Sequence, residues 1–354
     1  MRNGAIDLYR FVFCWLVMFF HFDQKHFPLG KIGVEFFVLV SGFYFFSKWE
    51  RYRSAHEDRS SYLPAYMKKR YLRFLPYTFL AFVFTFFVRR IWLVLAQGGT
   101  IALNALLIDL SGDVWEILLI DMLGFNNGSQ MLNVPTWTVS CMLIVEFAVL
   151  CVLTYDEKLF SRLICPLSLL VGFGYWRTME AANHELWIGA MTFGTLRVWL
   201  ITCLSYYGYH IALRIKRVHF TRAGKALLTA IEAVSLLLVV AIAMHYSSRN
   251  FQWISTLLLL GACAIAFSER SFSIKAFRDS RLTRYLGQLS FGVFLIHMPI
   301  LSIYEFCFDN VTEHLLSYCA VVLLSSVLLL ALVNAMLSAL RGLGGLRTRF
   351  VRDE

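Results

Sequence analysis

Residues 6–23 read IDLYRFVFCWLVMFFHFD, a run in which most side chains are apolar or aromatic. A hydrocarbon core of roughly 30 Å takes about 20 mostly apolar helical residues to cross, and this run is nearly that long. Arg2 precedes it, and Phe-Asp-Gln at residues 22–24 follows where a signal peptide would have a small-residue cleavage site. The stretch therefore predicts a retained first membrane span.

Apolar runs of the same kind recur along the whole chain of 354 residues. Hydrophobic residues make up 58% of the sequence and charged residues 16%, and the mean hydropathy is +0.63. This composition excludes a disordered chain and a soluble nucleic-acid-binding protein, and it leaves no block for a separate soluble domain. We expect residues 1–354 to form a single integral-membrane domain that has the lipid bilayer, and no nucleic acid, as a partner.

Ten segments are candidates for membrane-spanning helices, and they predict an all-α polytopic bundle of about ten transmembrane helices. Residues 32–46 are short for a membrane span, and residues 163–177 contain two glycines. An even number of spans places both termini on one side of the membrane. The candidates are residues 6–23, 32–46, 74–94, 135–153, 163–177, 188–207, 226–246, 253–268, 285–304 and 315–340.

Basic residues are distributed unevenly between the two sets of connections. With a cytoplasmic N-terminus, 25 of the 33 Lys and Arg residues lie in cytoplasmic segments and six in outer segments or at the outer ends of spans, while Arg10 and Arg197 lie deeper within spans. Lys and Arg near span ends remain cytoplasmic, so this asymmetry predicts that the N- and C-termini are both cytoplasmic. Contact with anionic lipid of the inner leaflet then explains the net charge of +10.

The longest connection, residues 95–134, is predicted to lie outside, and it is not uniformly polar. Within it, residues 101–110 and 114–125 intersperse Leu and Ile with acidic residues, as amphipathic or partly re-entrant segments do. We expect this connection to form an outer cap over the bundle, suited to an extracytoplasmic ligand.

Eight cysteines are scattered singly through the apolar stretches, with no Cys-x-x-Cys pair and no histidine at metal-ligand spacing. We interpret them as small buried hydrophobic residues and expect no metal site. They are Cys14, Cys141, Cys151, Cys165, Cys203, Cys263, Cys307 and Cys319.

Arg10 and His21 stand out in the first span, because titratable groups within a bilayer are costly and often functional. Eleven residues at 100° each bring the two side chains within about 20° of one face, roughly 16 Å apart along the helix. An arginine that can hold an anion and a histidine that can move a proton would thus share one face at two depths. The alternative is that Arg10 reaches the inner headgroups beside Asp7 and that His21 marks the outer interface.

Five short motifs follow one another along the chain. They are Asp7-Leu8-Tyr9-Arg10 with His21 after ten intervening residues, Gly33-Val34-Glu35-Phe36-Phe37-Val38-Leu39-Val40-Ser41-Gly42-Phe43, Arg70-x-x-Arg73 followed by Pro76, Asn133-Val134-Pro135-Thr136-Trp137-Thr138-Val139-Ser140, and Leu286-Gly287-x-x-Ser290 with His297-x-Pro299. In this order, and over nearly the whole chain, they resemble the motifs of the acyltransferase 3 family of integral-membrane acyltransferases.

The resemblance implies an O-acyltransferase in the cytoplasmic (inner) membrane, by family analogy that of a bacterium. Such an enzyme moves an acyl group, most often acetyl, from cytoplasmic acyl-CoA to a hydroxyl of a glycan or lipid-linked saccharide, and so modifies polysaccharides of the cell envelope. Acyl-CoA, with acetyl-CoA foremost, is then a donor substrate, and no permanently bound cofactor is expected. An acceptor other than a glycan stays open.

The resemblance also implies roles for individual residues. His21 would be the catalytic residue and Arg10 its partner, while Arg70 and Arg73 would hold coenzyme A. Imidazole titrates near neutrality, as a base that deprotonates a hydroxyl should, and guanidinium groups bind phosphates bidentately. The basic cluster at residues 68–73 would also follow from the positive-inside rule alone.

The motif that begins at Asn133 departs from the family at one position. Many members have a glutamate five residues after Trp137, where this chain has Met142. Glu146 lies four residues later on the same helix face, so either it takes that place or this branch lacks the acid. Depth along the helices favours a different role, in which Glu146 and Arg197 meet near the middle of the bilayer and neutralise each other.

Four further residues are candidates for supporting roles. Glu35 could orient the catalytic imidazole, as carboxylates do in hydrolase triads, or lie at the headgroup level. Ser41, beside a glycine, is expected to permit close helix packing rather than to act as a nucleophile. Ser290 and His297 are seven residues apart and share a helix face, where they would line a pocket or form an interhelical hydrogen bond.

A secondary transporter would also contain about ten spans with Arg, Glu and His inside the membrane, and composition alone makes it the main alternative. It predicts helices broken by Gly or Pro in matched halves of the chain, whereas the six prolines lie mostly at the ends of predicted spans. We therefore favour the acyltransferase. The sequence leaves the oligomeric state open.

Overall fold

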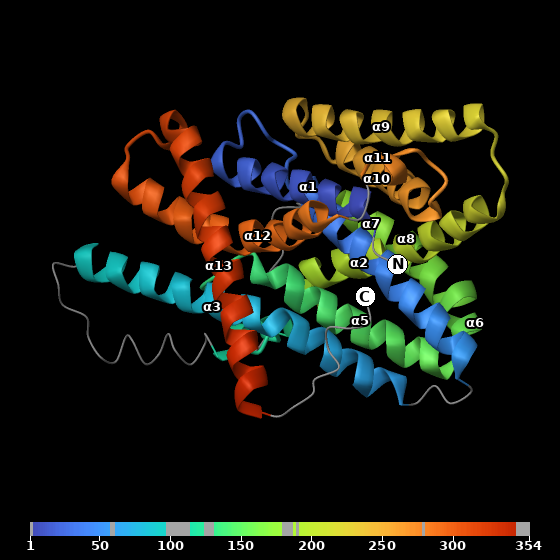
Figure 1. Cartoon of the computed structure of the whole chain (residues 1–354), viewed down its shortest axis with the longest axis horizontal. Coiled ribbons are helices and arrows are strands. Elements are labelled where there is room, and N and C mark those ends of the chain that lie inside the picture. Colours follow the sequence, from blue (N-terminus) through green and yellow to red (C-terminus); the bar gives the residue numbers. More distant parts are fainter. Residues whose placement is uncertain are drawn as a thin grey trace.

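The computed structural model describes residues 3–56, 61–96, 114–123, 131–178, 187–188, 191–277 and 280–344. These residues form a bundle of long helices (Figure 1). The described residues include one short antiparallel pair of strands, β1 (Trp187–Ile188) and β2 (Met191–Thr192). The predicted all-α class is confirmed.

Each of the ten predicted spans coincides with a helix. These helices are α1 (Gly4–Phe22), α2 (Ile32–Ala55), α3 (Tyr62–Ala96), α5 (Thr136–Tyr155), α7 (Cys165–Thr178), α8 (Phe193–Arg217), α9 (Arg222–His245), α10 (Arg249–Ser268), α12 (Arg281–Cys307) and α13 (Leu315–Gly344). Shorter elements join them: η1 (Asp121–Leu123), α6 (Glu157–Leu159), the π-helical turn η2 (Phe160–Ile164), α11 (Ser273–Ala276) and η3 (Val311–His314).

Eight helices in the described part of the chain are long and apolar enough to cross a membrane, namely α1, α2, α3, α5, α9, α10, α12 and α13. The two predicted spans outside this set correspond to α7, which has 14 residues, and α8, which has 25 residues but contains Arg197 and a basic last turn. The predicted start of the span at residues 188–207 is also wrong, because residues 187–188 form β1 and the helix begins at Phe193.

Polar side chains mark where several helices begin. Asn3, Thr192 and Thr221 accept hydrogen bonds from backbone N–H groups in the first turns of α1, α8 and α9. Ser280 and Thr283 form a capping box at the start of α12. Each cap satisfies N–H donors that have no partner within the helix, so it fixes the point where a connection ends and an apolar run becomes helical.

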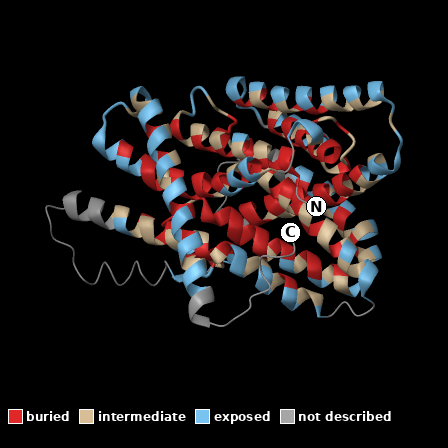
Figure 2. Cartoon of the chain, viewed as in Figure 1, coloured by how far each residue is buried: buried red, intermediate tan, exposed pale blue. Residues whose placement is uncertain are grey.

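Burial is concentrated in the middle of the bundle, whereas α9 lies at one edge and exposes its outer side (Figure 2). The exposed residues of α9 include Leu227, Ile231, Val234 and Leu237. An apolar outward face is what a helix needs where lipid replaces water, because hydrocarbon offers no partner to polar groups. The pattern agrees with the predicted membrane bundle.

The cysteine prediction holds only in part. All eight cysteines are free thiols, and five of them are buried. Cys151 and Cys307 are exposed and Cys319 is partly exposed, so the predicted burial is wrong for these three. A thiol is apolar enough to lie on an outward helix face as well as in a core.

α1 lies among the central helices, where it packs against α12 and α2 (Figure 1). The side-chain amide of Asn3 donates to the backbone carbonyl of Ala266 at 2.9 Å, so the start of α1 and the end of α10 lie at the same end of the bundle. This antiparallel relation is the one that the predicted alternation of spans requires. The orientation of the bundle in the membrane stays a prediction.

Gly42 lies at a close contact between α2 and α8. A Cβ atom at Gly42 would lie 2.4 Å from the Cβ of Ser205, closer than the Cβ atoms of real side chains approach a neighbour. Small residues permit such close contact between membrane helices. The close packing expected beside Ser41 is therefore present at its neighbour.

We predict that Gly42→Val destabilises the folded protein by about 1–3 kcal/mol, the usual cost of an overpacked core. Thermal unfolding in detergent should show a lowered midpoint. Gly261→Val is the matched control, since Gly261 also lies within a helix but a Cβ atom added there would meet no heavy atom of another side chain within 4 Å. Equal shifts for the two variants would contradict the close contact of α2 and α8.

Candidate active site

His21 lies in the last turn of α1, beside a second histidine from α12. The ring centroids of His21 and His297 are 5.3 Å apart, and the ring planes meet at 38°. His21 is partly exposed, whereas His297 is fully buried. Two imidazoles that are far apart in the sequence therefore lie together, beside the end of α1.

The buried imidazole of His297 has one satisfied nitrogen. Its Nδ1 lies 3.2 Å from the backbone carbonyl oxygen of Val293, which can only accept a hydrogen bond. With the proton assigned to Nδ1 on this ground, Nε2 carries a lone pair. That Nε2 has no hydrogen-bond partner among the described residues.

The turn of α12 that carries His297 is held by two other helices. Pro299 lacks an N–H group, so it leaves the carbonyl of Leu295 without its usual helical partner. The side-chain amide of Asn133, just before α5, donates to this carbonyl at 3.1 Å. The hydroxyl of Tyr318, from α13, donates to the backbone carbonyl of His297 at 2.9 Å. The motifs around Asn133 and around His297 are thus one structural unit.

Glu116 fixes the described part of the predicted cap to the start of α5. Its carboxylate accepts hydrogen bonds from the backbone N–H groups of Leu132 and Asn133, at 2.6 and 2.8 Å, and from the Thr136 hydroxyl at 3.1 Å. Burial raises the pKa of Glu116 to about 7, against the effect of the hydrogen bond from Asn133, and the charge of Asp121 raises it further. Sequence reasoning placed Glu116 in the cap but found no partner for it.

The rest of the predicted cap falls on residues 97–113 and 124–130, which lie outside the described residues. In the described part, the backbone N–H of Met122 points at the Ser140 hydroxyl, 3.4 Å away, so η1 also lies against α5. Trp137 is buried in the first turn of α5. That residues 95–134 cover a ligand stays a prediction.

Arg10 lies about three turns before His21 on α1, next to Asp7. The guanidinium and the Asp7 carboxylate are 3.8 Å apart, and the side chain of Arg10 is 22% exposed while that of Asp7 is buried. Gly287 of α12 leaves the room for Asp7, because a Cβ there would lie 2.4 Å from its Oδ1. Ser290 is buried and donates to the Gly287 carbonyl at 2.9 Å, which is a bond within α12 rather than between helices.

Arg73 brings a second cation toward Arg10. Arg73 is exposed on α3, and the charges of Arg10 and Arg73 both act on the phenol of Tyr77. The ring of Tyr77 meets Phe291 of α12 edge to face, with centroids 5.5 Å apart. Arg10 of α1 and Arg73 of α3 therefore both lie near enough to Tyr77 for their charges to act on the same phenol.

Arg70, the other arginine of the Arg-x-x-Arg motif, is engaged within the bundle. Its guanidinium donates to both carboxylate oxygens of Glu146, from Nε at 2.9 Å and from Nη2 at 2.8 Å. Ser41 accepts from the same Nη2 and donates to Glu146 at 2.9 Å, and the Tyr66 hydroxyl donates to Glu146 at 3.0 Å. A bidentate pair of this kind ties α2, α3 and α5 together.

Arg197 pairs with Glu35, so the predicted pairing of Glu146 with Arg197 is wrong. Arg197 donates to Oε1 of Glu35 from Nε at 2.9 Å and also from Nη2, and Gln252 donates to the same oxygen at 2.6 Å. Glu35 is fully buried. Its Oε1 is thus held by α8 and α10, and that Glu35 orients the imidazole of His21 stays a prediction.

The position of a residue along its helix sets its level in the bilayer, but it does not determine which helices are neighbours. Glu35 and Arg197 meet because α2 packs directly against α8. The acid in α5 finds its counter-charge on α3 instead. Glu146 does lie in a buried polar cluster, but the role of the family glutamate stays a prediction for it.

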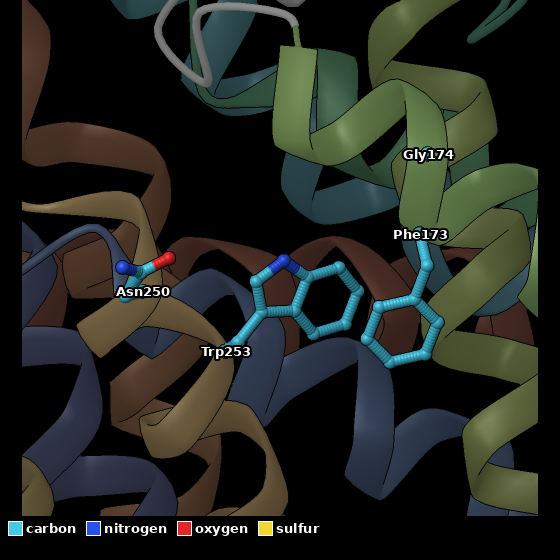
Figure 3. A pocket seen from close by; sticks show the side chains of 4 residues that line it. All are labelled: Phe173, Gly174, Asn250 and Trp253. Carbon is cyan, nitrogen blue, oxygen red and sulfur yellow. The ribbon is translucent and has the colours of Figure 1, made fainter.

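A pocket of about 430 Å³ lies between α7 and α10, lined by Phe173, Gly174, Asn250 and Trp253 (Figure 3). The rings of Phe173 and Trp253 stack with centroids 4.0 Å apart. None of the predicted site residues lines this pocket, and none of its four residues can act as an acid or base near neutral pH. We therefore place the candidate active site at the α1–α12 contact.

Comparison with known proteins identifies a family. Residues 3–332 match the sequence profile of a family described as "Acyltransferase domain", the acyltransferase 3 family. No curated protein and no solved structure matches the chain. The matched range includes every residue of the site described above.

We predict that Glu35→Gln destabilises the bundle by about 3–5 kcal/mol, since it leaves the guanidinium of Arg197 buried without a counter-charge. Adding Arg197→Gln should restore part of the loss, and thermal unfolding in detergent measures it as a non-additive cycle. The combination of Glu146→Gln with Arg197→Gln is the control and should be additive. An additive cycle for Glu35 and Arg197, with a non-additive one for Glu146 and Arg197, would refute the pairing of Glu35 with Arg197.

Proposed function

The chain belongs to the acyltransferase 3 family, and we propose on this premise that it is a membrane O-acyltransferase that moves an acyl group, foremost acetyl, from cytoplasmic acyl-CoA to a hydroxyl of an extracytoplasmic glycan. The observation that carries the proposal is the position of His21. It is a partly exposed imidazole at one end of α1, with a second imidazole beside it, the guanidinium of Arg10 about three turns back along α1, and that of Arg73 on α3.

In the proposed reaction, His21 takes the proton of the acceptor hydroxyl as its oxygen attacks the thioester carbonyl carbon. The new C–O bond forms, the C–S bond breaks, and the proton passes from His21 to the departing sulfur, which leaves as the free thiol of coenzyme A. The step is balanced without a further reactant. An imidazole suits it because it gains and loses a proton near neutral pH.

Arg10 and Arg73 are the residues that we assign to the donor. The phosphates of acyl-CoA lie far from its thioester. Arg10 and Arg73 would bind the phosphates at one level of the bundle, while His21 acts on the thioester at another. Both side chains are at least partly exposed. Arg70, which we predicted to share this role, already binds Glu146 through two hydrogen bonds, and we now assign it to holding α3 against α5.

The acceptor and the location rest on the family and on the charge pattern. A glycan or lipid-linked saccharide on the outer side of a bacterial cytoplasmic membrane would reach the end of α1 where His21 lies, if the N-terminus is cytoplasmic as the distribution of Lys and Arg predicts. Mass spectrometry of surface glycans from cells with and without the protein tests this. A gain of acetyl mass is expected, and unchanged glycans would overturn the glycan acceptor.

We predict that His21→Ala lowers acyl transfer by roughly 10²–10⁴-fold, the usual effect of losing a positioned general base. The control is His26→Ala, which removes an exposed histidine paired with Asp23 in the connection after α1. The measurement is the initial rate of acyl transfer by protein of equal thermal stability. A twofold effect at His21 would contradict the assignment, and a transport assay on the same variants would reveal the alternative transporter.

We predict that Arg73→Gln weakens acyl-CoA binding roughly tenfold or more, because a hydrogen bond to a charged group contributes about 1.5–3 kcal/mol. Calorimetry on the detergent-solubilised protein measures the affinity. Lys68→Gln removes the same charge from an exposed position about 140° around the helix and should leave the affinity nearly unchanged. Equal losses for the two variants would mean that only the general positive charge matters.

A further inference from the structure

We propose that His297 is the positioning residue for His21, holding one nitrogen of the His21 ring through the contact between α1 and α12. The inference rests on the proposed function, because it gives His297 a role in the same transfer. It adds a second histidine that acts on the first and never touches the substrate.

The tautomer of His297 makes this role possible. The carbonyl of Val293 holds a proton on Nδ1, and the Nε2 lone pair is left without a donor in the described part of the chain. A buried acceptor without a partner is costly, so the site favours a conformation that supplies a donor.

His21 is the ring that can supply that donor. Its centroid lies 5.3 Å from that of His297, so a small rotation of the partly exposed side chain brings an N–H of His21 to the waiting Nε2. Catalytic hydrogen bonds are often long in the empty enzyme and tighten when substrate binds. Once this bond forms, the other nitrogen of His21 is fixed as the unprotonated one.

The consequence for the reaction is a defined proton path. The unprotonated nitrogen of His21 receives the proton of the acceptor hydroxyl, and His297 stabilises the resulting imidazolium by accepting from its opposite N–H. The proton then passes from His21 to sulfur as the thiol departs. His297 keeps its own proton on Nδ1 throughout, so the transfer stays balanced.

The surroundings suit a positioning role. Asn133 and Tyr318 hold the turn of α12 around His297, at the backbone carbonyls of Leu295 and of His297 itself. A carboxylate orients the catalytic histidine in hydrolase triads, but Glu35, which we had expected in that place, is engaged by Arg197. A neutral imidazole provides the acceptor here.

The test compares His297→Gln with His297→Asn and His297→Leu in protein purified in detergent. Gln carries its amide oxygen at about the reach of Nε2, Asn is too short to do so, and Leu has no acceptor. We expect His297→Gln to keep kcat within a few-fold, and the other two to lose at least roughly tenfold in kcat with little change in KM for the acceptor. An orienting carboxylate contributes up to about 10⁴-fold in a hydrolase triad, which sets the upper range.

Thermal unfolding of the three variants separates this effect from misfolding. If His297→Leu does not fold, the comparison of the two amides decides the matter, because they differ only in reach. Equal kcat values for the Gln and Asn variants, or a raised KM with unchanged kcat, would overturn the positioning role. If the wild type is active and His21→Ala inactivates it, such a result overturns the role of His297 alone. If the wild type shows no acyl transfer, the proposed function is overturned as well.

Discussion

An ionised side chain inside a bilayer has to find its counter-charge within the protein, and the arrangement of this bundle follows from that requirement. Glu35 with Arg197 joins α2 to α8, and Glu146 with Arg70 joins α5 to α3. Both pairs are surrounded by additional hydrogen bonds, from Gln252 in the first case and from Ser41 and Tyr66 in the second. Apolar packing alone discriminates weakly between helix neighbours in lipid, so these pairs specify which helices adjoin.

The two arginines of the Arg-x-x-Arg motif illustrate how one short pattern serves two purposes. They are three positions apart, which places them about 60° apart around α3. Arg70 thereby turns into the bundle toward Glu146, and Arg73 toward its outside. A lysine would not replace Arg70, because the paired N–H groups match both oxygens of the carboxylate.

Hydropathy and charge predicted the class of fold and the positions of ten helices, because the length of an apolar run is a local property. The partners of the buried acids were not predictable in the same way. They depend on which helices are neighbours, and the local pattern of one amino-acid sequence does not encode this. The family motifs identified His21 and His297 separately. Their contact, and the hydrogen bond from Asn133 to the carbonyl freed by Pro299, appear only once α1, α5 and α12 are packed together.

Asn133 donates two hydrogen bonds, one on each side. Its backbone N–H donates to Glu116, while its side chain donates to the carbonyl of Leu295, two residues from His297. Asn133 thus links residues 114–123 to the turn of α12 that carries His297. By linkage, a ligand that displaced the carboxylate of Glu116 would also bias the geometry of α12, and that geometry would bias the affinity for the ligand. In the proposed acyltransferase, an acceptor that bound beside Glu116 would therefore promote the alignment of His21.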